Sequence, residues 1–246
     1  MNAIVFGATK GMGRAVARRL AERGDAVFLL GRDVVELSKS AADLEARSPR
    51  QAKAGVAVCD LADVGGFEGA LDAAFAALGR VDAVVVTAAR FDTQLVLEED
   101  TAKLHALLDA DFTATILFCE AARRRLLAQG GGTLCVFSSV AGDRGRKPVV
   151  LYGAAKAGLS AYLEGLDHKF HASGLRVVCV KPGFVKTGMT AGLEPPPFAG
   201  DPDGVARTVV RAIDRGTPVV YAPPIWRWVL FVIRRLPRFV MRRIGF

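Results

Sequence analysis

The sequence has few residues of the kinds that bind metal ions. Its 246 residues include only four cysteines and three histidines. No two cysteines have the Cys-x-x-Cys spacing, and no histidine cluster stands beside them. This pattern argues against a metal site and favours buried structural thiols in a reducing compartment. The four cysteines are Cys59, Cys119, Cys135 and Cys179.

Signals of secreted, modular or membrane-spanning proteins are also missing. No internal repeat, low-complexity tract or linker divides the chain, and it starts directly with an apolar run at residues 4–6 rather than a signal peptide. The longest uncharged stretch near the carboxyl end, residues 228–233, is far shorter than the roughly 20 apolar residues that a spanning helix needs. With 51% apolar residues, we expect one large cytoplasmic domain.

Short apolar runs, rich in β-branched residues, alternate with longer segments of helical period. Continuous apolar runs predict strands that are buried on both faces. Their alternation with helices predicts an α/β fold, a Rossmann-type doubly wound parallel sheet of about seven strands. We expect this domain at residues 1–223, with residues 224–246 as a basic amphipathic carboxyl-terminal segment of it. The expected strands are 3–6, 26–30, 56–59, 83–86, 134–137, 177–180 and 219–221, and the expected helices 12–23, 34–47, 65–78, 101–129, 151–173 and 202–215.

A glycine-rich segment, Gly-x-x-x-Gly-x-Gly, joins the first expected strand to the first helix. Glycine suits this place because backbone must approach a pyrophosphate closely, and the N–H groups at the helix start face the phosphate charge. A turn between core elements is the alternative, but the position after the first strand favours dinucleotide binding. The residues expected to bind the cofactor are Gly7, Thr9, Lys10, Gly11, Met12 and Gly13.

Residues after the second and third expected strands bear on which dinucleotide is bound. An arginine after the second strand, here Arg32, suits a ribose 2′-phosphate, whereas an acid suits a free 2′-hydroxyl. Together with Lys10, which also fits a solvated loop charge, Arg32 indicates NADP(H). Asp33 is interpreted as the N-cap of the next helix. Asp60, followed by Leu61, either accepts from the adenine amino group or caps the following turn.

A serine, a tyrosine and a lysine in the carboxyl half have the spacing of a proton-transfer site. Ser139 follows the fifth expected strand, and Tyr152 and Lys156 share one face of a helix. A free tyrosine has a pKa of about 10, and a nearby ammonium favours its phenolate. The phenol then passes a proton to a carbonyl oxygen as hydride arrives, while Ser139 hydrogen-bonds that oxygen and Lys156 holds the nicotinamide ribose. Tyr-x-x-x-Lys alone also fits a surface helix pair, but its combination with the serine and the glycine loop is far more specific.

In these motifs the sequence resembles the short-chain dehydrogenase/reductase family over about residues 1–221. The matching segments are GATKGMG, FSSVAG, YGAAK and KPGFVKT. The resemblance implies a seven-stranded Rossmann sheet, a homo-oligomer, and the family's catalytic serine, tyrosine and lysine at Ser139, Tyr152 and Lys156. It also implies that a Pro-Gly-x-Val-x-Thr segment lies along the nicotinamide, formed by Pro182, Gly183, Val185 and Thr187.

The sequence departs from the family pattern at two places. The family has Asn-Asn-Ala-Gly after the fourth strand; here stands Thr87-Ala88-Ala89-Arg90, in which Ala88 is expected to contact the cofactor. The family also has an asparagine in a proton relay, and the corresponding residue is Asp111. If the residue at this position acts through its backbone, the change from asparagine to aspartate keeps that role. A buried aspartate carboxylate, in contrast, changes the pKa values of the ionisable groups around it. Asp111 is therefore a catalytic candidate whose place in the relay is open.

A narrower resemblance, to the decaprenylphosphoryl-2-keto-erythro-pentose reductase group, begins at Ser138. It implies an NADPH-dependent reductase of a keto-sugar on a polyprenyl phosphate, which supplies the second half of an epimerisation. That group departs from this chain at Asp111. The resemblance rests on SSVAGDRGRKP, YGAAKAGLSAYLEGL, KPGFVKTGMTAGL and VVYAPPIWRWVLFVIRRLPRFVMRRI.

The carboxyl-terminal tail, residues 225–246, mixes arginines with bulky apolar residues and has no acid. A basic segment with tryptophans at one end fits a helix in the headgroup region, here at the inner face of the membrane. Pro237 is expected to kink or divide it. Packing on the domain or on a sister subunit is the alternative, and the interleaved aliphatics argue against nucleic acid. The arginines are Arg227, Arg234, Arg235, Arg238, Arg242 and Arg243.

Two loops border the expected substrate pocket. Residues 143–147 carry Arg144, Arg146 and Lys147, which either bind a substrate phosphate or are solvated. Residues 189–200, rich in proline and glycine, are interpreted as a mobile lid. The leading hypothesis is an NADPH-dependent reductase of a keto-sugar on a polyprenyl phosphate, so the expected partner is a small-molecule or lipid-linked carbonyl substrate. The alternatives are a soluble ketoreductase of acyl, steroid or similar substrates and a non-catalytic NADP-binding regulator.

Overall fold

A seven-stranded, wholly parallel sheet forms the centre of the computed structural model, which describes residues 1–50 and 52–245. The strand order is β3-β2-β1-β4-β5-β6-β7, and the direction of strand succession reverses between β1 and β4. This is the predicted doubly wound Rossmann-type sheet, whose ligand site lies at the carboxyl ends of the strands beside that reversal. The strands are β1 (Asn2–Phe6), β2 (Ala26–Gly31), β3 (Gly55–Val58), β4 (Ala83–Val86), β5 (Gly132–Phe137), β6 (Leu175–Pro182) and β7 (Val219–Ala222).

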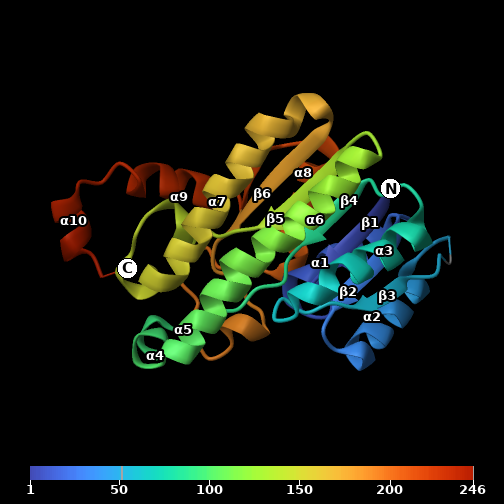
Figure 1. Cartoon of the computed structure of the whole chain (residues 1–246). Coiled ribbons are helices and arrows are strands. Elements are labelled where there is room, and N and C mark those ends of the chain that lie inside the picture. Colours follow the sequence, from blue (N-terminus) through green and yellow to red (C-terminus); the bar gives the residue numbers. More distant parts are fainter. Residues whose placement is uncertain (51, 246) are drawn as a thin grey trace.

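Helices cover both faces of the sheet (Figure 1). Successive strand residues point to opposite faces, so Val5 packs with α1, α2 and α8, whereas Phe6 packs with α3, α6 and α7. On the second face the ring of Phe118 contacts those of Phe6 and Phe67. The helices are α1 (Gly11–Glu22), α2 (Val34–Arg47), α3 (Phe67–Leu78), α4 (Gln94–Glu99), α5 (Thr101–Leu108), α6 (Thr115–Ala128), α7 (Val150–Phe170), α8 (Pro202–Arg215), α9 (Trp226–Ile233) and α10 (Arg238–Arg243).

Three local features differ from the predicted elements. The expected helix at 101–129 is divided into α5 and α6 by a π-helical turn, Asp109–Ala114. A short helix, α4, occupies a segment in which none is predicted. The edge strands β3 and β7 are not buried on both faces: the residues of β3 alternate between half-buried and exposed, and Val219 of β7 is exposed.

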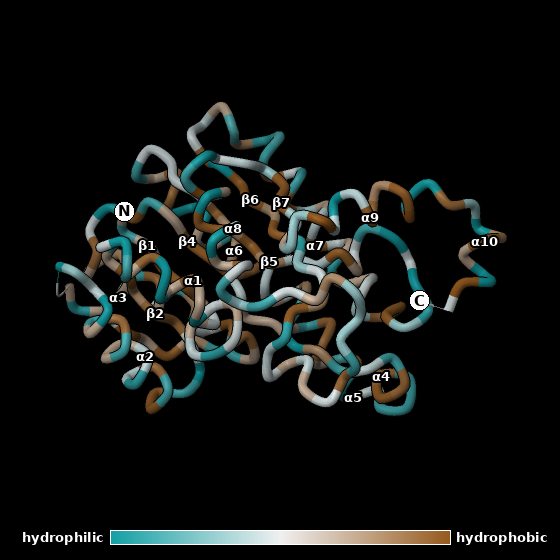
Figure 2. The backbone as a smooth tube through the Cα atoms, turned by 180° about the vertical axis from the view of Figure 1, so that it is seen from behind, coloured by the Kyte–Doolittle hydropathy of each residue, from teal (hydrophilic) through white to brown (hydrophobic). Residues whose placement is uncertain are grey.

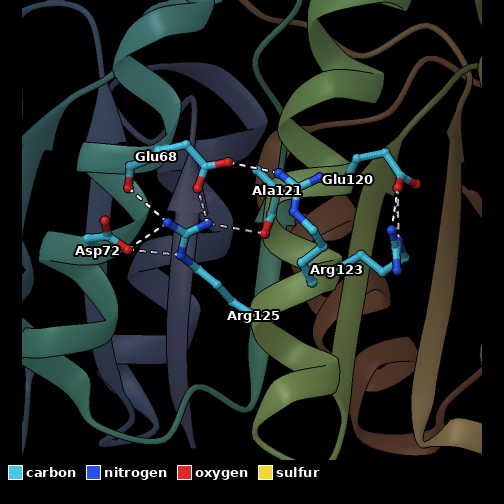
Figure 3. A network of polar contacts seen from close by, with 7 residues as sticks. Glu68, Asp72, Glu120, Ala121, Arg123 and Arg125 are labelled. Atoms are coloured by element: carbon cyan, nitrogen blue, oxygen red, sulfur yellow. Dashed lines mark hydrogen bonds and ion pairs between the residues drawn. The ribbon is translucent and has the colours of Figure 1, made fainter.

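A charged network joins α3 to α6 across the outer surface (Figure 3). The guanidinium of Arg125 forms ion pairs with the carboxylates of Glu68 and Asp72. On the neighbouring turns of α6, Arg123 pairs with Glu120, whose other carboxylate oxygen accepts a hydrogen bond from the Tyr162 hydroxyl. These contacts fix α6 between α3 and α7, and α6 continues directly from the π-helical turn.

The carboxyl-terminal tail lies at one end of the molecule as two short helices (Figures 1 and 2). Pro237 separates α9 from α10, as predicted. Trp226, Leu230 and Ile233 are buried against Val140, so α9 packs on the domain, whereas Trp228 is 65% exposed. The expectation of two tryptophans at a membrane surface is therefore wrong for Trp226. No helix within residues 1–50 and 52–245 has the length and apolarity needed to span a membrane.

Candidate active site

A cavity of about 430 Å³ lies at the carboxyl ends of β1 and β4, where the strand order reverses. It extends from the start of α1 to the ends of β2 and β3 on one side and to the loop after β6 on the other. Most residues expected to bind the cofactor line it: Gly7, Thr9, Lys10, Gly11, Met12, Gly13, Arg32, Asp60, Leu61, Ala88 and Thr187.

The glycine loop is closely packed at its two ends and open in the middle. A Cβ on Gly7 would lie 2.6 Å from the amide nitrogen of Ala88, and a Cβ on Gly13 would lie 2.2 Å from the carbonyl oxygen of Gly7. At Gly11 the nearest neighbour of a Cβ would be Thr187, at 3.5 Å. The Lys10 side chain does not cap α1, which begins at Gly11. The N–H groups at this helix start therefore face the cavity, where an anionic group is favoured.

The residues after β2 and β3 have two different tasks. The exposed Arg32 side chain stands at the cavity lining. The Asp33 carboxylate accepts the N–H groups of Val35 and Glu36 at 3.0 and 3.1 Å, which confirms its interpretation as an N-cap. Asp60 accepts the N–H of Ala62 at 3.1 Å. The turn-capping alternative for Asp60 is thus realised, and its contact with adenine stays a prediction.

The segment after β4 connects the cavity to the predicted catalytic residues. The Thr87 hydroxyl donates to the carbonyl oxygen of Phe6 at 2.9 Å, which ties β4 to β1 beneath the glycine loop. The Arg90 N–H donates to Asp111 Oδ1 at 2.6 Å. The ring of Phe91 meets that of Tyr152 edge to face, with centroids 5.2 Å apart. Thr87 thereby supports the turn, while Arg90 and Phe91 contact the site itself.

Ser139, Tyr152 and Lys156 come together at the end of β5 and the start of α7. The Ser139 Oγ accepts the N–H of Ala141 at 3.1 Å, and the Ser139 side chain acts on Tyr152 to lower the pKa of the phenol. Lys156 Nζ lies 5.6 Å from the centroid of the Tyr152 ring. The Lys156 carbonyl accepts from the hydroxyls of Ser138 and Ser160 at 2.9 and 2.8 Å. The serine, tyrosine and lysine predicted from their spacing are therefore neighbours in space.

Asp111 lies next to these residues. Its Oδ2 is 3.1 Å from Lys156 Nζ, and both side chains are almost completely buried. Burial raises the pKa of the Asp111 carboxyl, against the opposing effects of Lys156 and the Arg90 N–H. Burial also disfavours the Lys156 ammonium, but Asp111 and Tyr152 together hold the pKa of Lys156 above its ordinary value.

The Tyr152 hydroxyl is in surroundings that favour its protonated form. Burial raises the pKa of Tyr152 above its ordinary value, and the Asp111 carboxylate raises it further. Lys156 and the hydrogen bond with Ser139 act in the opposite direction but do not cancel this shift. The phenol is therefore neutral at neutral pH and has a proton to donate.

The loop after Ser139 is clamped between α7 and the tail. A Cβ on Gly142 would lie 2.6 Å from the carbonyl carbon of Lys156, so the loop backbone lies directly on α7. The buried Asp143 carboxylate pairs with Lys181 and accepts from the Tyr221 hydroxyl. Arg144 and Lys147 donate to tail carbonyls, those of Leu236 and Arg242. The sequence predicts that these basic residues are solvated or bind a substrate phosphate. Hydrogen bonds from Arg144 and Lys147 to the tail match neither prediction.

The segment after β6 supplies backbone to the site. Gly183 is packed against the indole of Trp226, whose Nε1 would lie 2.0 Å from a glycine Cβ, and the Val185 side chain is buried in the core. Within the described residues, Pro182, Gly183 and Val185 do not line the cavity, while Thr187 does. The expected lid turns back at Gly200, whose N–H donates to the Phe184 carbonyl at 2.8 Å. Lid residues 190–193 and 195 line a second cavity of about 480 Å³, together with Phe184 and residues 186–188.

Some residues of the site carry no signal in the sequence. Phe91 follows the unusual segment after β4 and matches no expected motif. Ser138 and Ser160 donate to the Lys156 carbonyl and hydrogen-bond each other, and the partners of Asp143 come from β6 and β7. Contacts of this kind depend on how distant segments pack rather than on local spacing.

Comparison with known proteins gives a consistent result. The family model described as short chain dehydrogenase matches residues 1–197. An uncharacterized oxidoreductase of Mycobacterium tuberculosis is 33% identical over 245 residues, covering 98% of this chain and 96% of that protein. Carbonyl reductase family member 4 of Xenopus tropicalis is 31% identical over 214 residues, covering 84% of this chain and 88% of that protein.

A solved structure agrees with the fold. The short-chain type dehydrogenase/reductase of Mycobacterium ulcerans matches with a TM-score of 0.81 at 23% identity, covering 89% of this chain and 86% of that one. The family match covers most of the chain, including the glycine loop and the Ser139, Tyr152 and Lys156 positions. The chain therefore belongs to the short-chain dehydrogenase/reductase family and is an oxidoreductase of that family.

Proposed function

We propose that this oxidoreductase is an NADPH-dependent reductase of a ketone, with Tyr152 as the acid. The observation that carries the proposal is the convergence of Tyr152, Lys156 and Ser139. A protonated phenol held beside a serine hydroxyl provides two donors for one carbonyl oxygen. The raised pKa of Tyr152 suits proton donation rather than proton removal at neutral pH.

The residues around the cavity fit an NADP(H) molecule. Gly7 and Gly13 allow the glycine loop to close against β4, and the uncapped start of α1 offers N–H groups to a pyrophosphate. Arg32 and Lys10 are exposed cations at the same cavity and would bind the 2′-phosphate that distinguishes NADPH from NADH. When bound, the nicotinamide supplies the hydride for the new C–H bond at the carbonyl carbon.

The chain's own residues handle the proton and the oxygen. Because Ser139 Oγ already accepts from the Ala141 N–H, its hydrogen is directed outward, toward Tyr152 or a substrate oxygen. The Tyr152 O–H bond breaks as the carbonyl oxygen becomes a hydroxyl, and the phenolate that remains lies beside Lys156, whose Nζ is 5.6 Å from the ring centroid. The edge-on ring of Phe91 limits the motion of the Tyr152 ring and excludes water from one side.

We further propose a keto-sugar on a polyprenyl phosphate as the substrate, with the tail in contact with the membrane. Trp228, Phe231 and Phe239 are exposed on α9 and α10 beside arginines. Such a mixture suits the headgroup region of an anionic bilayer, where each arginine contributes about 1 kcal/mol. The tail also contacts the loop after Ser139 through Arg144 and Lys147, so a membrane-bound substrate would meet the site close to the surface.

A soluble ketoreductase of acyl, steroid or similar carbonyls is the second candidate. The burial of Trp226, Leu230 and Ile233 against Val140 favours it, because α9 then serves as an ordinary wall of the domain. The two candidates share the mechanism and differ in what the tail contacts.

The first experiment is NADPH oxidation by the purified protein, with and without a polyprenylphosphoryl-2-keto-pentose, with Tyr152→Phe as the control. Substrate-dependent oxidation that the variant loses supports both the mechanism and the lipid-linked sugar. NADPH oxidation with simple ketones but not with the keto-pentose supports the mechanism and rejects the lipid-linked sugar as the substrate. NADPH binding, measured by fluorescence, without turnover of either substrate supports a non-catalytic regulator instead.

A second experiment tests membrane contact by sedimentation with vesicles of anionic phospholipid. Removal of the whole tail would expose the core beneath α9, so the better variant lacks only residues 238–246, since α10 has no buried residue. Vesicle binding that this variant loses while its thermal stability is kept supports membrane contact. Sedimentation of neither protein rejects membrane contact, and equal sedimentation of both rejects a contact made by residues 238–246.

A further inference from the structure

Asp111 is a deeply buried carboxylate beside the predicted catalytic residues. Its side chain is wholly buried; Oδ1 accepts a hydrogen bond, whereas Oδ2 takes part in an ion pair but in no hydrogen bond. Oδ1 accepts the Arg90 N–H at 2.6 Å, and Oδ2 lies 3.1 Å from Lys156 Nζ. The carboxylate therefore joins the loop after β4 to the lysine that stands beside Tyr152.

The π-helical turn Asp109–Ala114 directs Asp111 toward α7. The Thr115 hydroxyl donates to the Ala110 carbonyl at 2.7 Å, within the widened turn. Gly158 on α7 lets the Phe112 ring approach, since a Cβ there would lie 2.7 Å from the ring. A π-helical turn inside an α-helix is commonly found at functional sites. Here the turn places the carboxylate of Asp111 in the protein interior, at a position where a helix normally has an apolar residue.

When Asp111 and Lys156 hold one proton between them, the ion pair has no net charge, whichever group carries the proton. A solitary ammonium beside Tyr152 would favour the phenolate, whereas a neutral pair gives the phenolate little support. We propose that Asp111 is a positioning residue that neutralises Lys156 and keeps Tyr152 a protonated donor. The inference rests on the proposed function, because it assigns the reductive direction to the same site.

The other groups facing these residues do not replace this effect. On the loop after β4, Arg90 acts on Asp111 through its N–H and its charge. On β6, Cys179 faces Lys156, and burial raises the pKa of that thiol, so it is neutral. Ser139 adds a hydrogen bond to Tyr152 but no charge. Besides burial, which has the largest effect on the pKa of Tyr152, the charged groups that act on this phenol are Lys156 and Asp111.

The sign of the effect follows from the direction of proton transfer. Carbonyl reduction needs the phenol, so its rate is constant below the pKa of Tyr152 and falls above it. Alcohol oxidation needs the phenolate and rises through the same pKa. Removal of the Asp111 charge lowers that pKa, so reduction fails at a lower pH and oxidation begins at a lower pH.

The test is a spectrophotometric titration of phenolate absorbance in the cofactor-free protein, which needs no substrate. The chain has three tyrosines, and burial together with hydrogen bonds to Glu120 and Asp143 raises the pKa of Tyr162 and Tyr221. Subtraction of the Tyr152→Phe titration isolates Tyr152. Asp25→Asn is the matched control, because Asp25 is also a buried, ion-paired carboxylate. It directly precedes β2 and so lies at the amino ends of the strands, whereas the site lies at their carboxyl ends.

Asp111→Asn is expected to lower the pKa of Tyr152 by about 1 unit or more. At a given alkaline pH below this pKa, the variant should then contain roughly tenfold more phenolate. In Asp111→Asn/Lys156→Gln the pair is neutral again, and the pKa is expected to return close to that of the parent protein. The double variant also avoids a lone buried charge if the single variant does not fold. Unchanged titration in Asp111→Asn, or a double variant shifted like the single one, overturns the proposal.

Rates of NADPH oxidation with a ketone distinguish failure of this inference from failure of the proposed function. A lower pH limit for reduction in Asp111→Asn supports both. A shifted phenolate titration in a protein that reduces no ketone supports the charge role and rejects the reductase. Loss of activity without any change in titration makes Asp111 a purely structural residue and rejects the inference.

Discussion

The backbone of Gly142 lies on the backbone of Lys156 so closely that a single added carbon would come within 2.6 Å of the lysine carbonyl carbon. Gly142→Ala therefore forces the loop that carries Ser139 away from α7. We expect a loss of about 1–3 kcal/mol in the free energy of unfolding, together with a fall in kcat that exceeds the change in KM for NADPH.

Gly145→Ala in the same loop is the control, because a Cβ there would meet nothing within 4 Å. Urea unfolding and steady-state kinetics of the two variants test this prediction. Equal kcat in Gly142→Ala and the parent protein would show that the loop adjusts without moving Ser139.

Arg32 and Asp33 are neighbours that we expect to act on different properties. Arg32→Ala removes a charge-assisted contact with a 2′-phosphate, worth about 1.5–3 kcal/mol, and should weaken NADPH binding about tenfold or more without weakening NADH binding. Asp33→Ala removes the N-cap of α2 and should cost about 1 kcal/mol of stability while the cofactor preference is kept. Fluorescence titration with both nucleotides measures the first effect, and equal loss for NADPH and NADH would contradict it.

Trp226 and Trp228 are expected to separate the packing of α9 from membrane contact. Trp226→Ala opens a cavity beside Val140 and should lower the free energy of unfolding by about 3 kcal/mol or more. Trp228→Ala changes an exposed residue and should leave stability almost unchanged while it weakens sedimentation with anionic vesicles. Equal vesicle binding by Trp228→Ala and the parent protein would remove this tryptophan from the proposed membrane surface.

Glu120 should make the stability of the α6 face depend on pH. Burial disfavours its carboxylate, but the hydrogen bonds from Arg123 and Tyr162 hold the pKa of Glu120 below its usual 4.5. A lowered folded-state pKa stabilises the protein above 4.5, and the effect is lost as the pH falls through the folded value. Glu120→Gln should therefore have a lower Tm than the parent protein at pH 7, and the difference should shrink on acidification. A constant difference would contradict this account.

The strands and the site motifs could be predicted because their signals are local. Short β-branched runs identified each strand, and Tyr152 and Lys156 lie four residues apart on one helix. The spacing of Trp226, Leu230 and Ile233 is also that of a buried helical stripe, a signal that separates Trp226 from Trp228.

The division of the helix after α5 could not be predicted in the same way. The sequence around Asp111 has ordinary helical residues, and the π-helical turn depends on the Thr115 hydroxyl and on the space beside Gly158. The ion pair of Asp111 with Lys156 joins residues on different helices. Such pairing is decided by tertiary packing, so the sequence identified Asp111 only as a departure whose outcome was open.

The contacts between the loop after Ser139 and the tail also bear on the order of folding. Arg144 reaches Leu236 and Lys147 reaches Arg242, across sequence separations of 92 and 95 residues. Contacts between distant segments carry a large loop-closure cost and form after local ones. During synthesis, the sheet from β1 to β5 can assemble while the serine loop is still unclamped. The glycine loop would then be able to bind a nucleotide before the chain has a complete site for chemistry.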